Sequence, residues 1–239
     1  MICFKNVCLE FDTPVLSDVD FKLPTGAALG LLGVGGAGKS ALLKLCCGLL
    51  TPQRGQVLLG TRSVFELAGP ELAVLRSRIG MAFQNSALFD FMSVGENIAF
   101  PLRQQGQMAS GEIHRRVAHT LEQVSLAGIE AFAPSELSGG MRKRVCLARA
   151  VIHEPEFLFC DDPTAGLDPV TASRIFRMIS TLRQERNATV IVVSHDTQGL
   201  FSFCDYIALM EDQSLRFFGP TSQAITDPRV SRFVHGQSP

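Results

Sequence analysis

The sequence lacks several features that mark common classes of protein. Lys and Arg number 22 against 23 Asp and Glu, so there is no basic excess of the kind that attracts phosphate backbones. We therefore expect no nucleic acid partner. No two of the seven cysteines have the spacing C-x-x-C, which argues against a zinc site and against a small disulfide scaffold. Scattered thiols in an odd number are typical of a reducing cytosol.

A secretion signal and a membrane span are also lacking. The first residues show no basic segment followed by an apolar stretch, so we expect the chain to start and stay in the cytosol. The most apolar stretch, residues 26–38, is shorter than a membrane span, is broken by glycines and is followed at once by Lys39. Any link to a membrane is therefore expected through a partner.

Apolar patterning predicts the strands. The chain has 239 residues, of which 46% are hydrophobic, enough for a large core that we interpret as one domain with two lobes. Partly alternating apolar residues within 2–23 predict an N-terminal antiparallel section with one buried face. Continuous apolar runs at 27–32, 157–160 and 189–193 predict parallel strands that are buried on both faces.

Helical signals lie between those strands. Residues 40–47 predict a helix that Gly48 caps, and Ser93 with Glu96 forms a capping box for a helix that Pro101 should end. Pro169 fits the first turn of a later helix. Further apolar residues recur at helical spacing: Ile113, Val117, Leu121, Val124, Val145, Ala148, Val151, Ile175, Ile179 and Leu182. The fold class is therefore α/β, a mainly parallel sheet flanked by helices, with a mostly helical middle third.

A phosphate-binding loop is the first functional signal. Residues 33–40, GVGGAGKS, match G-x-x-x-x-G-K-[ST] between a predicted buried strand and a predicted helix. Glycines let backbone N–H groups converge on phosphate, while Lys39 reaches the β and γ phosphates and Ser40 ligates Mg²⁺. The predicted ATP contacts here are Gly33, Gly35, Gly36, Ala37, Gly38, Lys39, Ser40 and Ala41.

The same glycines fit a rival motif. Gly33, Gly35 and Gly38 also satisfy G-x-G-x-x-G, the signal of a dinucleotide-binding oxidoreductase. That class needs an acidic residue about 20 residues further on. Residues 51–62 contain no Asp or Glu, and the rival does not explain Lys39 and Ser40. A glycine turn that serves only packing is the plainest alternative.

Polar residues end two of the predicted buried strands. Asp161 ends an apolar strand, where a phosphate-loop enzyme places a magnesium contact, and Asp162 follows where a carboxylate could deprotonate the attacking water. His195 ends another buried strand and is predicted to touch the γ-phosphate. Taken singly, each has a structural alternative, namely a surface carboxylate or a structural histidine.

A third motif gives these residues a family. The sequence LSGGM at 137–141 lies between the phosphate loop and the strand that ends in Asp161, and this ordered set resembles the nucleotide-binding domain of ABC transporters, a P-loop NTPase fold. Within that resemblance Gln84 corresponds to the glutamine loop, a catalytic residue and magnesium contact, residues 165–168 to the D-loop and His195 to the switch histidine. Phe11 is a candidate for stacking on adenine, with a core phenylalanine as the even alternative.

The resemblance implies an assembly and a division of the chain. Two subunits, identical or paired, would sandwich two ATP molecules with Mg²⁺, so that Ser138, Gly139 and Gly140 of one face the phosphate loop of the other. Lys39, Gln84, Asp162 and His195 form the implied catalytic set. We expect a core lobe of residues 1–84 and 153–225, a helical lobe of 85–152 and a tail of 226–239.

A subgroup within the family is also indicated. Residues 83–89, residues 97–102, Met141 and the stretch 227–236 look like the ATPase of Mla-type phospholipid transporters. This resemblance implies lipid as substrate, an integral membrane permease, a lipid-shuttle protein and a location at the cytoplasmic face of the inner membrane. Phe89, Phe91 and Met92 are candidates for the groove that receives the permease, and core packing is the equal alternative for each.

Three positions depart from the family pattern. Asp162 stands where the family has Glu, and its side chain is shorter by one bond of roughly 1.5 Å. Because a misplacement of about 1 Å can cost on the order of 100-fold in rate, we expect intact ATP binding and slow hydrolysis. Ala41 replaces a usual Thr, and Met141 replaces a usual Gln.

Two other functions compete with transport. One is an ABC-type ATPase without a permease, acting on DNA, ribosomes or iron–sulfur assembly. The chain has no long heptad insertion and a single phosphate loop, and we interpret the basic cluster Arg142, Lys143 and Arg144 as a solvated helix face. The other is a regulatory nucleotide-binding module with slow turnover, which Asp162 favours.

Overall fold

The computed structural model describes residues 1–106 and 108–236, in two compact units. The last three residues of the predicted tail, 237–239, lie outside the described residues. The first unit, residues 1–76 with the chain from 189 onward, contains β1 (Ile2–Glu10), β2 (Pro14–Leu23), β3 (Ala28–Gly33), α1 (Lys39–Cys46), β4 (Arg54–Leu59), β5 (Arg62–Ser63), α2 (Gly69–Arg76), β8 (Thr189–Val193), α7 (Thr197–Phe203), β9 (Tyr206–Glu211), β10 (Ser214–Pro220), α8 (Thr221–Ala224) and α9 (Pro228–Val234). The second unit, residues 77–188, contains β6 (Ile79–Ala82), α3 (Val94–Gln105), α4 (Ser110–Gln123), a 3-10 turn (Pro134–Glu136), α5 (Gly139–Val151), β7 (Phe157–Asp161) and α6 (Pro169–Arg186).

The first unit begins with an antiparallel sheet, as predicted. Its strand order is β2-β1-β4-β5, and Phe4 of β1 lies opposite Phe21 of β2. The two rings stack with their centroids 4.8 Å apart, and both side chains are buried. Alternation along β2 buries Val19, Phe21 and Leu23 on one face, the arrangement that period-two patterning predicts.

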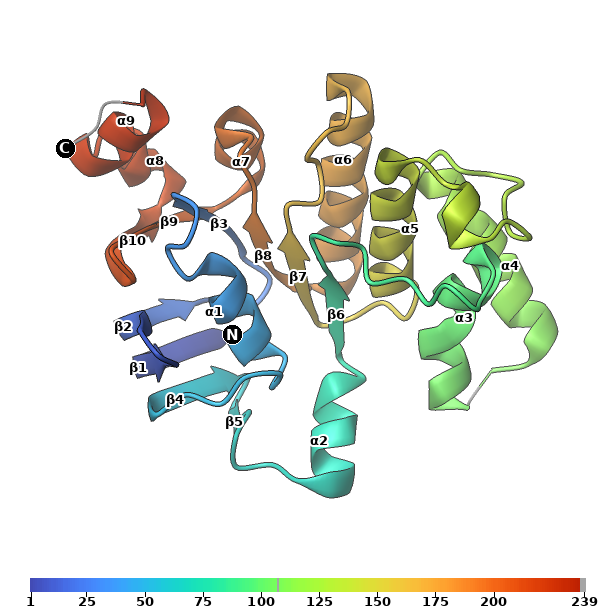
Figure 1. The fold of residues 1–239 in the computed structure, drawn as a ribbon, viewed down its shortest axis with the longest axis horizontal. Helices are drawn as coiled ribbons and strands as arrows, with labels where there is room; N and C mark the ends of the chain where they lie inside the picture. Colours follow the sequence, from blue (N-terminus) through green and yellow to red (C-terminus); the bar gives the residue numbers. More distant parts are fainter. Residues whose placement is uncertain (107, 237–239) are drawn as a thin grey trace. The chain divides into compact units, whose positions relative to one another are not determined.

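The first unit also contains a mostly parallel set of strands around β3. β3 pairs in parallel with β8 on one side and β9 on the other, and β10 continues antiparallel to β9. Every residue of β3 and of β8 is buried, which confirms the predicted central strands. Helix α1 packs against β3 and β8 and α7 against β3, and Figure 1 shows both helices beside these strands.

The second unit is a parallel strand pair with helices. β6 pairs with β7, so that Ala82 lies opposite Cys160. Helix α5 packs against both strands and against α3 and α4, as Figure 1 shows. The apolar residues predicted to face inward on α4 and α5 are buried, which confirms the mostly helical middle third: Ile113, Val117, Leu121, Val124, Val145, Ala148 and Val151.

Helix ends follow the predicted signals with one exception. The Ser93 hydroxyl accepts from the Glu96 N–H while the Glu96 carboxylate accepts from the Ser93 N–H, so the capping box is confirmed. The prediction that Pro101 ends this helix is wrong, because α3 continues to Gln105. Ile98 and Leu102 on either side are buried, and their packing outweighs a proline cost of about 3 kcal/mol.

No helix in residues 1–106 or 108–236 is long and apolar enough to cross a membrane.

Candidate nucleotide-binding site

The phosphate loop runs from the end of β3 into α1, and its glycines differ in what they do. Gly38 has φ 93°, and a Cβ there would lie 2.5 Å from the Val15 carbonyl oxygen, so the fold itself requires glycine. At Gly35 and Gly36 a Cβ would meet no atom within 4 Å, and both residues are exposed. The loop is therefore packed against the rest of the unit at Gly38. At Gly35 and Gly36 it is open, so that phosphate oxygens could approach the backbone there.

Lys39 already bends over this loop. Its Nζ donates to the carbonyl oxygens of Gly33 and Val34, each at 2.7 Å, so the ammonium group is held at the loop. Ser40 and Ala41 follow in the first turn of α1, partly buried. Positive charge, exposed backbone and a helix N-terminus together fit a phosphate group.

His195 lies beyond the strand next to this loop. In the parallel pair of β3 and β8, Leu31 is opposite Val193, so the phosphate loop and His195 follow neighbouring strands at one edge of the sheet. His195 is exposed. The structure thus brings the ends of these two strands together, as the prediction of parallel strands requires.

Phe11 occupies the turn between β1 and β2. Its N–H donates to the Thr13 carbonyl at 3.2 Å, and 62% of the residue is exposed. The alternative that Phe11 is a buried core residue is therefore wrong. An exposed ring in this turn is free to contact a flat ligand, and adenine stacking stays a prediction.

Two strand ends meet in the same way in the second unit. Gln84 lies two residues beyond β6, while Asp161 ends β7 and Asp162 follows it. Gln84 is exposed, whereas the two aspartates are only 8% and 6% exposed. Asp162 has φ 55°, a left-handed conformation that Asp and Asn adopt more readily than most residues. A shorter acid at this position therefore fits the local backbone.

The LSGGM sequence opens α5. Ser138 caps the helix, and its hydroxyl accepts from the Met141 N–H at 3.3 Å. Gly139 is exposed, and a Cβ on it would meet no atom within 4 Å, whereas Gly140 is partly buried beside the Leu167 side chain. The first turn of α5 therefore presents uncovered backbone N–H groups, which is the arrangement that an anion needs.

The basic cluster that follows is a solvated face only in part, because Arg142 is exposed whereas Lys143 and Arg144 are partly buried. The Arg142 guanidinium donates to the Leu137 carbonyl at 2.6 Å, and Lys143 donates to the Ala165 carbonyl at 2.8 Å. Arg144 donates to two carbonyl oxygens at the end of α4, and partial burial lowers its pKa. Each cation contacts main-chain oxygens, because Leu137, the segment after β7 and the end of α4 all come within reach of α5.

Asp168, directly before α6, has a clear structural role. Its carboxylate caps α6 by accepting from the N–H groups of Val170 and Thr171, both at 3.0 Å. The Thr171 hydroxyl also donates to it, and these bonds hold the Asp168 pKa below its ordinary value. Lys143 donates to the carbonyl oxygen of Ala165, three residues before Asp168. This bond connects α5 to the turn before α6.

Two polar residues near the 83–93 loop were not predicted. Asn97 of α3 is fully buried and bonds to the main chain of that loop, and Arg149 of α5 donates to the Ser86 carbonyl. The available signal for Asn97 was an Asn directly after the capping box, beside the apolar residue Ile98. Nothing in the local pattern marks Arg149.

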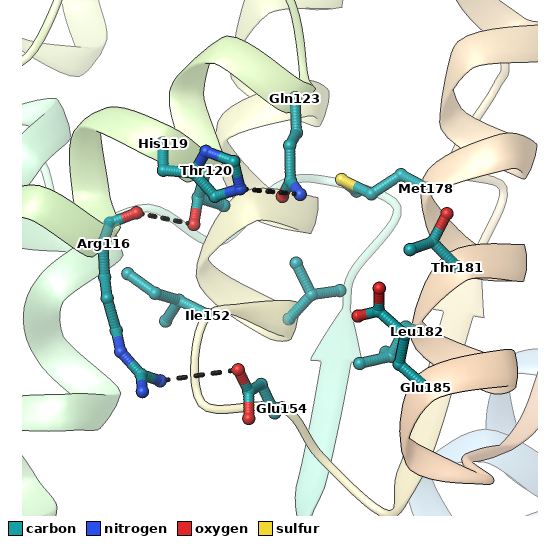
Figure 2. A pocket seen from close by; sticks show the side chains of 11 residues that line it. Arg116, His119, Thr120, Gln123, Ile152, Glu154, Met178, Thr181, Leu182 and Glu185 are labelled. Atoms are coloured by element: carbon teal, nitrogen blue, oxygen red, sulfur yellow. Dashed lines mark hydrogen bonds and ion pairs between the residues drawn. The ribbon is translucent and has the colours of Figure 1, made fainter.

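A cavity of about 270 Å³ lies elsewhere in the second unit. It is lined by α4, by the segment after α5 and by α6, and Figure 2 shows Arg116 and Glu154 paired at one side of it. None of the predicted site residues lines it.

No cluster of three or more His, Cys, Asp or Glu suited to a metal ion occurs among the described residues. The oxygen contacts predicted for magnesium, from Ser40, Gln84 and Asp161, are of the kind that ion prefers.

Comparison with known proteins agrees with these motifs. A family model described as ABC transporter matches residues 16–165. The intermembrane phospholipid transport system ATP-binding protein MlaF of Haemophilus influenzae is 37% identical over 241 residues, which cover 100% of this chain and 91% of that protein. The probable ribonucleotide transport ATP-binding protein mkl of Mycobacterium leprae is 36% identical, covering 93% of this chain and 65% of that protein.

Solved structures give the same result. An ATP-binding cassette solved as a dimer in a post-hydrolysis state, bound to ADP and Pi, superimposes with a TM-score of 0.88 at 28% identity. The match covers 92% of this chain and 99% of that one. The chain therefore belongs to the ABC transporter family. It is an ATP-binding, ATP-hydrolysing subunit of that family, and its predicted α/β fold class is confirmed.

Proposed function

We propose that two copies of this chain, or this chain and a paired subunit, close around ATP and drive a membrane permease that moves phospholipid or another lipid. The observation that carries the proposal is the pair of open anion sites, the phosphate loop with Gly35 and Gly36 and the uncovered first turn of α5 at Gly139. A dimeric ATP-binding cassette with the same fold supports pairing. The phospholipid transport name of the Haemophilus influenzae relative supports lipid.

Within one site we assign roles as follows. Lys39 leaves the carbonyl oxygens of its own loop to contact phosphate, and Ser40, Gln84 and Asp161 are the residues that would hold Mg²⁺. When bound, Mg²⁺ neutralises phosphate charge. Asp162 accepts a proton from the attacking water, and His195 contacts the γ-phosphate oxygens. Phe11 stacks on adenine, and Ser138, Gly139 and Gly140 contact the nucleotide held by the other subunit.

The speed of hydrolysis rests on Asp162. Its left-handed backbone, φ 55°, and its burial fix where the carboxylate starts, and the side chain is one bond shorter than the family's Glu. We therefore expect slow turnover with intact binding, as the sequence alone suggested. This keeps a slow regulatory module as the second candidate.

Sedimentation tests the pairing directly. The Asp162→Asn protein should sediment as a monomer without ATP and as a dimer with ATP and Mg²⁺, because binding proceeds while hydrolysis stops. Adding Lys39→Ala to the same protein is the matched control and should abolish the dimer. A monomer under both conditions for Asp162→Asn would exclude the sandwich.

Partners and lipid need a second experiment. We propose an integral membrane permease, contacted by Phe89, Phe91 and Met92, a lipid-shuttle protein, and a position at the cytoplasmic face of the inner membrane. Phe91 is 82% exposed, which suits a contact surface. Purification from detergent-solubilised membranes should recover an integral membrane protein with the chain. Recovery without one would favour an ATPase that acts without a permease.

Substrate class can be tested on that purified complex. ATPase turnover is measured in vesicles at a fixed ATP concentration. It should rise when phospholipid is added, and it should not rise when a ribonucleotide other than ATP is added. The reverse result would favour ribonucleotide transport, the activity in the name of the Mycobacterium leprae relative.

We also propose that the chain divides by function into a core lobe of residues 1–84 and 153–225, a helical lobe of 85–152 and a tail of 226–239.

A further inference from the structure

The 83–93 loop, which joins β6 to α3, is bonded to one buried side chain, that of Asn97. Asn97 has no exposed surface, and its Oδ1 accepts from the Phe89 N–H at 2.8 Å. Its Nδ2 donates to the carbonyl oxygens of Phe89, Met92 and Ser93 at 3.0 to 3.2 Å. One amide group thus fixes the loop at both ends of the segment 89–93.

Arg149 binds the other part of the same loop. It lies in the last turn of α5, and its guanidinium donates to the Ser86 carbonyl at 3.1 Å and to Asn97 Oδ1 at 3.3 Å. Its charged group also lies over the Phe89 ring, 5.5 Å from the ring centre. The planar, branched guanidinium makes all three contacts at once, which a lysine ammonium could not reproduce.

The loop needs this support because its backbone is strained. Ser86 and Ala87 are consecutive residues with φ 61° and 45°, and Ala gains nothing from a left-handed conformation. Strained residues persist where their surroundings hold them. The Arg149 bond to Ser86 is placed where that restraint acts.

The same helix connects the loop to the nucleotide. Arg149 lies eleven residues after Ser138, roughly 16 Å along a straight helix. Lys143, between them, binds the Ala165 carbonyl of the D-loop. A shift of the 83–93 loop therefore acts on one rigid element whose first turn is the proposed ATP contact.

We propose that Asn97 and Arg149 are positioning residues that couple the 83–93 loop to the LSGGM end of α5. The proposal rests on the proposed function, in which a permease contacts the 83–93 loop and ATP contacts the first turn of α5. Coupling of this kind is reciprocal, so ATP bound at α5 must change the loop even when no permease is present.

Hydrogen exchange at the Phe89 amide tests the coupling, since this N–H is the one that Asn97 binds. The full chain carrying Asp162→Asn is measured with and without ATP and Mg²⁺, and ATP should slow exchange there. Adding Arg149→Met or Arg149→Lys should speed exchange without ATP by about tenfold and remove the response to ATP. Adding Arg103→Met, an exposed arginine on α3, should leave the response unchanged.

Sedimentation of the same samples separates the outcomes. An ATP-dependent dimer that keeps forming in the Arg149 variants, with the Phe89 response lost, supports the proposal. A response that persists in both Arg149 variants, or a parent dimer with no response at all, overturns the proposal and leaves the proposed function standing. Absence of the dimer in the parent overturns both.

Asn97→Asp provides a second variant that keeps the shape of the side chain. One carboxylate oxygen still accepts from Phe89 and Arg149, but the other can no longer donate to the carbonyl oxygens of Phe89, Met92 and Ser93. Exchange at Phe89 should become faster without ATP, because three carbonyl oxygens then face a buried acceptor, and the response to ATP should become smaller. A response equal to that of the parent would contradict the role of Asn97.

Discussion

The phosphate loop in the first unit and the LSGGM helix in the second are both open to an anion, but they are built differently. The loop depends on its own backbone, with Gly38 in a left-handed conformation and Lys39 bonded to carbonyl oxygens five and six residues before it. The helix depends on distant partners. Arg144 reaches the end of α4, and Arg149 reaches a carbonyl 63 residues away.

The difference shows what each anion site requires. A loop that is held by local geometry needs particular residues at fixed spacing, and it tolerates little change within that spacing. A helix end that is held by long-range side-chain bonds can be displaced as a whole. The first arrangement suits constant binding, and the second suits a part that responds to a partner.

The largest effect should come from the glycine that the fold requires. Gly38→Ala places a Cβ 2.5 Å from the Val15 carbonyl oxygen in a left-handed residue, which should cost about 3 kcal/mol or more of stability. Gly35→Ala enters open space and should cost less than about 1 kcal/mol. Urea unfolding of both variants measures the contrast, and equal losses would show that local geometry does not distinguish these glycines.

The second unit should show its dependence on distant bonds at Asn97. Asn97→Ala leaves partly buried backbone groups of Phe89 and Met92 without their partner, at a cost of about 2 to 4 kcal/mol. Asn85→Ala, at an exposed position in the same loop, should change stability by less than about 0.5 kcal/mol. The same unfolding titration compares them, and a small loss for Asn97→Ala would mean that the loop is held by other contacts.

Hydrolysis should respond to the length of the acid after β7. Asp162→Glu extends the carboxylate toward the water and should raise kcat by up to about 100-fold, with nucleotide affinity little changed. The longer side chain is less suited to φ 55°, so stability should fall by about 1 kcal/mol. Single-turnover kinetics with Asp162→Asn as the inactive control tests this, and an unchanged rate would show that Asp162 already reaches the water.

Nucleotide affinity should depend on Lys39. Lys39→Ala removes charged hydrogen bonds to phosphate and should weaken ATP binding by roughly 10- to 100-fold. Lys44→Ala, an exposed lysine on the same helix, is the matched control and should bind as the parent does. Fluorescent nucleotide titration compares them, and equal affinity for all three proteins would argue against the phosphate role of this loop.

The smallest effect concerns pH and the second unit. Burial lowers the pKa of His153 below its ordinary value of 6.5, and its Nε2 contacts the Ile79 carbonyl at 3.1 Å. Below that value the unfolded chain takes up a proton that the folded chain refuses, so stability falls as pH drops from 6.5 toward the lower folded pKa. The loss should be at most about 1.4 kcal/mol per pH unit.

Urea unfolding at two pH values on either side of the ordinary pKa measures this loss. His153→Gln should remove it, and His114→Gln, at an exposed position, should keep it. Equal pH dependence in the parent and in His153→Gln would assign the effect to other groups.

Sequence patterns predicted much of the fold and left particular contacts out. Continuous apolar runs identified β3, β7 and β8, and the capping box at Ser93 identified the start of α3, because these signals are local. The prediction from Pro101 was wrong, because the free-energy cost of a proline inside a helix is a local effect. The packing of α3 that outweighs this cost comes from other helices. The order of motifs indicated the family, whereas the roles assigned to single residues of the site stay predictions.

The sequence by itself determined the phosphate loop, the LSGGM helix start and the family, because each depends on residue types at fixed short spacing. The tertiary structure decided what holds the 83–93 loop and where the basic cluster of α5 points. Asn97 and Arg149 contact groups that folding brings near, and a side chain that bonds to a distant carbonyl leaves no periodic trace in the chain.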